Sequence, residues 1–166
     1  TNKTKILTYS SNGINWYVAN SSSGFIHTCN CIVWNGLIWV AGGITTSTSS
    51  PYKIFIYSND GITWFDGASS YYHNTINSIS WNGKLFVAGG QYGIYVFLYS
   101  TNGISWLDSS TLQISFICKN ILWNGNKWLA VGSPNNGTYV YVYSFDGQYW
   151  SNILKTSSIT TGNCVA

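Results

Sequence analysis

Charge is the scarcest property of this chain. Charged residues make up 7% of the 166 residues, and neither Arg nor Glu occurs. The seven Lys are spread along the sequence, whereas nucleic-acid binders gather basic residues in clusters that often include Arg. The composition therefore argues against a nucleic-acid partner. Low charge together with many Ser, Thr, Asn and Tyr residues suits a β-protein with a polar, uncharged surface and favours a virion or extracellular location.

Three further absences bound the class of protein. No apolar run is long enough to cross a membrane, so no membrane span is predicted. Met is absent and the first residue is Thr1, which indicates a segment or processed product of a larger protein. A sustained helical periodicity is also missing. We therefore expect one all-β domain over residues 1–166.

Aromatic residues, by contrast, are abundant and stand at repeated positions. Four of the nine Trp close a motif Tyr-Ser-x-Asx-Gly-x-x-Trp, and three others open a motif Trp-Asn-Gly-x-x-aromatic. The first motif closes at Trp16, Trp64, Trp106 and Trp150, and the second opens at Trp34, Trp81 and Trp123. The closing Trp are separated by 48, 42 and 44 residues, a period typical of a propeller blade of four short strands. The pattern predicts an array of one structural unit with most of these rings in its core.

Each unit is expected to contain four strands, A to D. Strand A runs into the Trp-Asn-Gly turn, strand B leaves it, strand C is rich in Tyr and Val, and the short strand D carries the closing Trp, as in Ile104-Ser105-Trp106. We expect a β-propeller of about three and a half blades. The expected parts are a half blade in 1–20, blades at about 26–66, 74–108 and 116–152, and a partial strand A in 161–166. Strand B of the split blade is missing, so we expect more chain or another copy to complete a ring.

The turns between strands carry an Asx-Gly pair for a physical reason. Tight two-residue hairpins need positive φ, which Asn, Asp and Gly tolerate best. The Ser two residues before the Asx of each C–D turn can also hydrogen-bond locally, so a structural role is favoured over a catalytic one. The structural turn residues are Asn35, Asn82 and Asn124 between A and B, and Asn12, Asp60, Asn102 and Asp146 between C and D.

These motifs resemble those of two propeller families. The stretch Ser58-Asn59-Asp60-Gly61-Ile62-Thr63-Trp64 resembles the Asp-box of bacterial neuraminidase repeats, Ser-x-Asp-x-Gly-x-Thr-Trp, but is one residue shorter. The Val-Ala-Gly-Gly runs at 40–43 and 87–90 resemble kelch repeats. The repeats are also similar to those of uncharacterised propeller proteins of large DNA viruses. The resemblance implies a β-propeller fold and says little about activity.

The resemblance to Asp-box proteins raises a sialidase activity. Sialidases clamp a carboxylate with several Arg and use a Tyr–Glu pair, and this chain has no Arg and no Glu. A glycosidase carboxylate pair is also hard to assemble, because Asp60 and Asp146 are turn residues and Asp66 and Asp108 occupy equivalent positions after strand D. A kelch-type copper oxidase would need His ligands, and both His residues, His27 among them, are read as loop residues. No catalytic residue, cofactor or metal ligand is predicted.

Three of the four cysteines precede a repeated Trp by three or five residues, and the fourth falls at the equivalent position of the partial strand A in 161–166. The four are Cys29, Cys31, Cys118 and Cys164. This spacing places all of them on the innermost strand of a blade. The Cys-x-Cys pair lacks the usual Cys-x-x-Cys spacing of zinc sites, so buried free thiols are favoured over a disulfide, and a disulfide over a metal site.

Recognition is the function that this sequence favours. The loops opposite the Asx-Gly turns vary in length, and variable loops on a rigid scaffold are common binding surfaces. The candidate binding residues are Tyr52, Tyr71, Tyr72, His73, Tyr92 and Asn135. We expect a non-enzymatic structural or interaction module with a protein or a glycan as its partner. The alternative is a piece of a glycosidase-like or oxidase-like propeller enzyme whose active site lies outside this segment.

Overall fold

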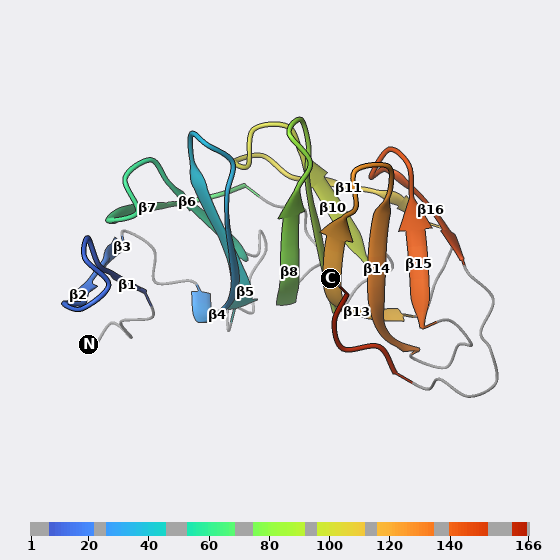
Figure 1. Ribbon diagram of the computed structural model, residues 1–166, viewed down its shortest axis with the longest axis horizontal. Coiled ribbons are helices and arrows are strands. Elements are labelled where there is room, and N and C mark those ends of the chain that lie inside the picture. Colours follow the sequence, from blue (N-terminus) through green and yellow to red (C-terminus); the bar gives the residue numbers. More distant parts are fainter. Residues whose placement is uncertain are drawn as a thin grey trace.

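The computed structural model describes eight stretches of the chain, and their regular structure is entirely β. The described residues are 7–21, 26–45, 53–68, 75–91, 96–111, 116–134, 140–152 and 161–165. These stretches hold sixteen strands and no helix, which confirms the expected all-β class (Figure 1). In this described part of the chain, no helix is therefore long and apolar enough to cross a membrane.

Three successive parts of the chain each form an antiparallel meander of four strands. Unit 1 comprises β4 (Ile26–Trp34), β5 (Trp39–Thr45), β6 (Phe55–Ser58) and β7 (Thr63–Asp66). Unit 2 comprises β8 (Thr75–Trp81), β9 (Phe86–Gln91), β10 (Phe97–Ser100) and β11 (Leu107–Asp108). Unit 3 comprises β13 (Phe116–Trp123), β14 (Trp128–Pro134), β15 (Tyr141–Ser144) and β16 (Tyr149–Asn152). The hairpin of β1 (Thr8–Tyr9) and β2 (Tyr17–Val18), which we call unit 0, precedes them.

Neighbouring units are joined by parallel backbone pairing at one repeated position. The residue four places after the closing Trp of one unit pairs with the residue just before the closing Trp of the next unit. The pairs are Asn20 with Thr63, Ala68 with Ser105, and Ser110 with Tyr149. The first and third belong to the short strands β3 (Asn20–Ser21) and β12 (Ser110–Thr111). Because the same contact recurs at three junctions, one repeated geometric step relates the units.

These connections merge the units into larger sheets. Units 1 and 2 also meet where Ile44 pairs with Thr75, so together with β3 they form one sheet of nine strands. Unit 3 and β12 form a five-stranded sheet, and unit 0 is a separate two-stranded one. Figure 1 shows the units following one another in chain order, from β1 and β2 at one end to β15 and β16 at the other, with the nine-stranded sheet strongly curled.

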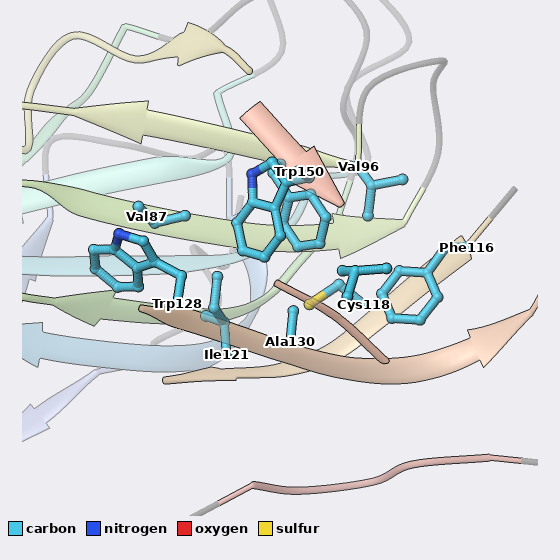
Figure 2. Close-up of a cluster of buried hydrophobic side chains, with 10 residues drawn as sticks. Val87, Val96, Phe116, Cys118, Ile121, Trp128, Ala130 and Trp150 are labelled. Atoms are coloured by element: carbon cyan, nitrogen blue, oxygen red, sulfur yellow. The ribbon is translucent and has the colours of Figure 1, made fainter. Parts of the chain in front are cut away.

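The hydrophobic core is divided among the junctions between units. One cluster joins Leu7 and Ala19 of the unit 0 region to Ala41, Ile56 and Trp64 of unit 1. A second cluster lies between units 1 and 2, and a third between units 2 and 3. Figure 2 shows the third cluster, in which Trp128, Ala130 and Trp150 of unit 3 face Val87 and Val96 of unit 2. Each unit therefore buries its faces against its neighbours, as stacked repeats do.

Some strand boundaries differ from the sequence expectation. The last strand of unit 2 was expected to include Trp106, but β11 begins at Leu107. The residues before it are held in a turn, because the N–H groups of Ile104 and Ser105 donate to Asn102 Oδ1. The tail at 161–165 is not assigned as a strand, although the Gly162 N–H donates to the Gly132 carbonyl at 2.8 Å beside β14.

Candidate functional site

The six loop residues expected to bind a ligand lie outside the described residues. They are Tyr52, Tyr71, Tyr72, His73, Tyr92 and Asn135. The described part of the chain presents three other surfaces with repeated chemistry. These are the Asx-Gly turns, the row of first strands β4, β8 and β13, and the faces at the two ends of the stack of units.

Each C–D turn is closed by one Ser and one Asx side chain. In the turn of unit 1, the Ser58 hydroxyl accepts from the Gly61 N–H at 2.8 Å and donates to Asp60 Oδ1 at 2.9 Å. The same Asp60 oxygen accepts from the N–H groups of Ile62 and Thr63 at 2.8 and 2.7 Å. Asn12, Asn102 and Asp146 accept equivalent pairs of bonds in the other three turns. The Oδ1 atoms of these Asx side chains therefore accept hydrogen bonds from backbone N–H groups of their own turns.

The A–B turns are two-residue hairpins, but the Asn of the expected Asx-Gly pair lies one position before the two central residues. Asn35 does not occupy a central position, because its own N–H donates to the Ile38 carbonyl at 3.3 Å. The central residues are Gly36, with φ of 98°, and Leu37. The Asn35 side chain then accepts from the N–H groups of Leu37 and Ile38, both at 2.8 Å. Asn82 and Asn124 make the same contacts, so the Asn side chain caps the turn and the Gly that follows it has a positive φ.

Asp60, Asp146 and Asp66 are each held by structural partners that suit their positions. Bonds from Thr63 N–H, Ile62 N–H and the Ser58 hydroxyl lower the pKa of Asp60 to about 2. Burial opposes ionisation of Asp146, but bonds from Tyr149, Gln148 and Ser144 outweigh it and hold its pKa below the ordinary value. Asp66 forms a partly exposed ion pair with Lys53, with Oδ2 and Nζ 2.8 Å apart.

A ladder of side chains crosses the row of first strands. Each of these strands has an irregular register four residues before its Trp, at Asn30, Asn77 and Lys119. Such a bulge releases the side chain of the extra residue from the regular alternation. Asn30 Nδ2 donates to the Ile76 carbonyl at 2.9 Å, and Asn77 Nδ2 donates to the Cys118 carbonyl at 2.7 Å. Lys119 Nζ donates to Asn163 Oδ1 at 2.9 Å, so the ladder reaches the tail.

The cysteines flank this ladder and are all free thiols. Cys118 is fully buried, Cys29 and Cys31 are half-buried, and Cys164 is exposed. Burial raises the pKa of Cys31 to about 12, and it raises the pKa of Cys29 and of Cys118. These three thiols are therefore neutral and poorly nucleophilic at physiological pH. The described residues contain no group of three or more His, Cys, Asp and Glu side chains that could hold a metal ion.

The two ends of the stack differ from its interior in the exposure of equivalent side chains. The closing residues Trp64, Trp106 and Trp150 are 2%, 4% and 3% exposed, whereas Trp16 of unit 0 is 62% exposed. The interior rings are covered by the preceding unit. Trp106 stacks on Phe55 and Trp150 stacks on Phe97, while Leu7 occupies the corresponding place near Trp64.

Sequence reasoning missed both the ladder and the exposed ring. Asn30 and Asn77 stand four residues before their Trp, so a repeated Asn at that place was an available signal, although Lys119 interrupts it. Trp16 carries the same motif as the other closing Trp, and nothing local distinguishes it. Its exposure follows from the absence of a preceding unit in the described structure.

Comparison with known proteins supplies no family. No protein-family model matches the sequence, and the search of curated proteins gives no significant match.

Proposed function

We propose that the chain is a β-propeller array whose blades serve as a structural or interaction module for a protein or a glycan. Each unit has the four antiparallel strands of a blade. The first strands of neighbouring units contact each other, as the innermost strands of blades do around a central axis. The repeated parallel pairing between units supports the same arrangement.

The interaction role is carried by exposed apolar side chains at one repeated position. The residue after the closing Trp is Tyr17, Phe65 or Leu107, and all three are exposed. Tyr17 lies beside Tyr9, with ring centroids 5.8 Å apart, and Phe65 lies beside Tyr57 at 5.7 Å. We call these three residues the outer apolar row. Exposed apolar groups, aromatic rings above all, suit contact with sugar rings and with protein interface anchors.

The scaffold beneath this row suits recognition. The side chains of its C–D turns form their hydrogen bonds within the turns. Two of the three core clusters between units contain stacked rings. A rigid scaffold with low surface charge binds through shape, stacking and neutral hydrogen bonds more than through long-range attraction. We place such a module on a virion or an extracellular surface, in keeping with its scarcity of charge.

A glycan array tests this role directly. We expect the purified chain to bind a defined set of glycans and the variant Tyr17→Ser/Phe65→Ser/Leu107→Ser to lose that binding. Ser is chosen because Ser151 is the natural residue at this position in unit 3. The loop variant Tyr71→Ala/Tyr72→Ala separates the second predicted surface from the row. Unchanged glycan binding by both folded variants would contradict both proposed surfaces.

A further inference from the structure

The junctions inside the chain define an interface with two distinct sides. The following unit supplies its closing Trp, and the preceding unit supplies the residue two places before the Tyr of its motif. Phe55 and Trp106 form this pair between units 1 and 2, with centroids 3.9 Å apart and planes 2° apart. Phe97 and Trp150 form it between units 2 and 3, at 3.7 Å and 11°.

The C–D turn enters the same interface. A Cβ placed on Gly103 would lie 2.6 Å from Val40 Cγ2, and one on Gly147 would lie 2.8 Å from Val87 Cγ2. Each turn glycine therefore packs tightly against the second strand of the preceding unit. Both positions favour glycine for two reasons. A Cβ would be crowded by the preceding unit, and φ is positive, at 71° for Gly103 and 76° for Gly147.

Unit 0 presents the following side of this interface without a partner in the described structure. Trp16 is largely exposed, unlike its three equivalents. A Cβ placed on Gly13 would meet no atom within 4 Å, although Gly13 has the same positive φ, 72°, as the packed turn glycines. Both elements that contact the preceding unit at the junctions of unit 1 with unit 2 and of unit 2 with unit 3 are thus without such a contact at this end.

Unit 3 presents the complementary side at the other end. Tyr141 holds the place of Phe55 and Phe97, and Leu129 holds the place of Val40 and Val87. The four interior residues are fully buried, whereas Tyr141 and Leu129 are half-buried. Among the described residues, none of the stacked or tilted ring pairs includes Tyr141. The two ends of one chain therefore carry the two halves of its own internal contact.

The tail occupies the position of a next first strand at this end. Interior first strands place Ile76 against Gly42 and Cys118 against Gly89, and the tail places Gly162 against Val131. The Val165 N–H also donates to Asn120 Oδ1 at 3.1 Å. A further hairpin can follow beside the tail, because Trp106 and Ile76 contact unit 1 through different residues, Phe55 and Gly42.

We propose that a second copy of this chain docks head to tail, with Trp16 of one copy stacked on Tyr141 of the other. This inference rests on the proposed role as a blade array. A second copy fits because it supplies the ring, the turn glycine and the hairpin that the interior junctions use. Two such contacts close a symmetric pair into a ring of roughly seven blades, a size within the usual propeller range. In that ring, the tail of one copy and β1 and β2 of its partner belong to one blade.

Sedimentation of the 166-residue chain over a range of concentrations tests the contact. We expect a dimer whose dissociation constant rises at least about tenfold in Trp16→Ala and in Tyr141→Ala, as for the removal of an aromatic interface anchor. An equimolar mixture of the two variants keeps one intact contact and should associate more strongly than either alone. Rescue of this kind requires a head-to-tail contact, because Trp16 packed on Trp16 would gain nothing from mixing.

A matched control separates the contact from general exposure of apolar groups. Leu37→Asn removes an exposed apolar side chain from a turn of unit 1, where Asn126 is the natural residue in unit 3. This variant should dimerise like the parent chain. Circular dichroism melts establish that the single variants fold.

A chain that remains monomeric at every concentration overturns the inference, and so does a dimer that Trp16→Ala leaves intact. A monomer would assign the Trp16 face to a preceding repeat of the same polypeptide. The glycan array tests binding by the outer apolar row independently of the dimer contact. A monomer that binds glycans therefore defeats only the dimer, and a dimer that binds none defeats only the glycan-binding role.

Discussion

The ring of Phe55 lies parallel to the ring of Trp106, with 3.9 Å between centroids and 2° between planes. Phe55 belongs to the third strand of unit 1, and Trp106 closes the turn before the last strand of unit 2. Both rings are buried, and the pair Phe97 and Trp150 repeats the arrangement at the next junction. Units 2 and 3 therefore each depend on the preceding unit for the burial of their closing Trp.

Removal of this stack should destabilise the array. We expect Phe55→Ala to lower the free energy of unfolding by about 3–5 kcal/mol, since it leaves a cavity beside Trp106. Phe55→Leu is the matched control, because Leu7 fills the equivalent place near Trp64. Its loss should stay below about 1.5 kcal/mol, as expected for a smaller change in apolar volume. Urea titrations measure both values. A loss in Phe55→Leu as large as the loss in Phe55→Ala would contradict the expectation that an aliphatic side chain can fill this place.

Where the second strand of one unit meets the first strand of the next unit, a glycine on one strand faces a larger residue on the other. A Cβ on Gly89 would overlap Cys118 Sγ, and one on Gly42 would lie 2.7 Å from Ile76 Cγ2, while Val131 faces Gly162. We expect Gly89→Val alone to cost about 1–3 kcal/mol through overpacking. The double variant Gly89→Val/Cys118→Gly recreates the pairing of Val131 and Gly162 and should recover part of that loss. A double-mutant cycle with no coupling energy would contradict the reciprocal packing.

The bulge ladder should contribute through its donors. Asn77→Asp keeps the size of the side chain but replaces the Nδ2 that donates to the Cys118 carbonyl at 2.7 Å. We expect a loss of about 1–3 kcal/mol near neutral pH, because the carbonyl is left without its donor beside a new negative charge. Asn124→Asp is a suitable comparison, since Asn124 uses its Oδ1 as an acceptor and a carboxylate can still accept. Equal unfolding midpoints for the two variants would argue against the ladder.

The carboxylates in the C–D turns should make stability depend on acid. The pKa of Asp60 is about 2 against an ordinary 3.8, and the pKa of Asp146 is also lowered. A lowered pKa gives stability that is present above the ordinary value and is lost as pH falls through the folded value. Stability should therefore decline between about pH 4 and pH 2, because these turns lose their ionised acceptors.

Substitution by Asn isolates that effect. Asp60→Asn/Asp146→Asn should flatten the dependence of the thermal midpoint on pH in the same range. The change is conservative, because Asn12 and Asn102 accept the same backbone bonds in the other two turns. Asp108→Asn removes a carboxylate outside the turns and should leave the decline in place. A double variant that remains as acid-sensitive as the parent chain would locate the titrating groups elsewhere.

Much of the fold was accessible from short-range patterns. The all-β class followed from strand-like runs bounded by Asx-Gly turns, and the structure confirms that class. The turn chemistry was accessible only in part. Asn35 was expected at a central turn position, but it precedes the two central residues and caps them with its side chain. A dipeptide motif identifies a turn without defining its register, since the register depends on which cross-strand pair lies next to the loop.

The candidate site was much less accessible. The four closing Trp have the same local motif, yet three are buried and Trp16 is exposed. Burial depends on a ring or an aliphatic side chain in another unit, which a local motif cannot contain. The bonds of Asn30 and Asn77 likewise end on carbonyls of the next unit, at Ile76 and Cys118.

The amino-acid sequence alone determined the strand-and-turn repeat, because glycine φ, Asx hydrogen bonding and aromatic spacing act within a few residues. The tertiary structure decided which equivalent residues are covered, which pairs share volume reciprocally and which end faces remain open. Those outcomes depend on contacts between residues of different units, such as Phe55 with Trp106. Only the stacking of units brings such residues together, and it is this stacking that leaves Trp16 and Tyr141 as complementary ends.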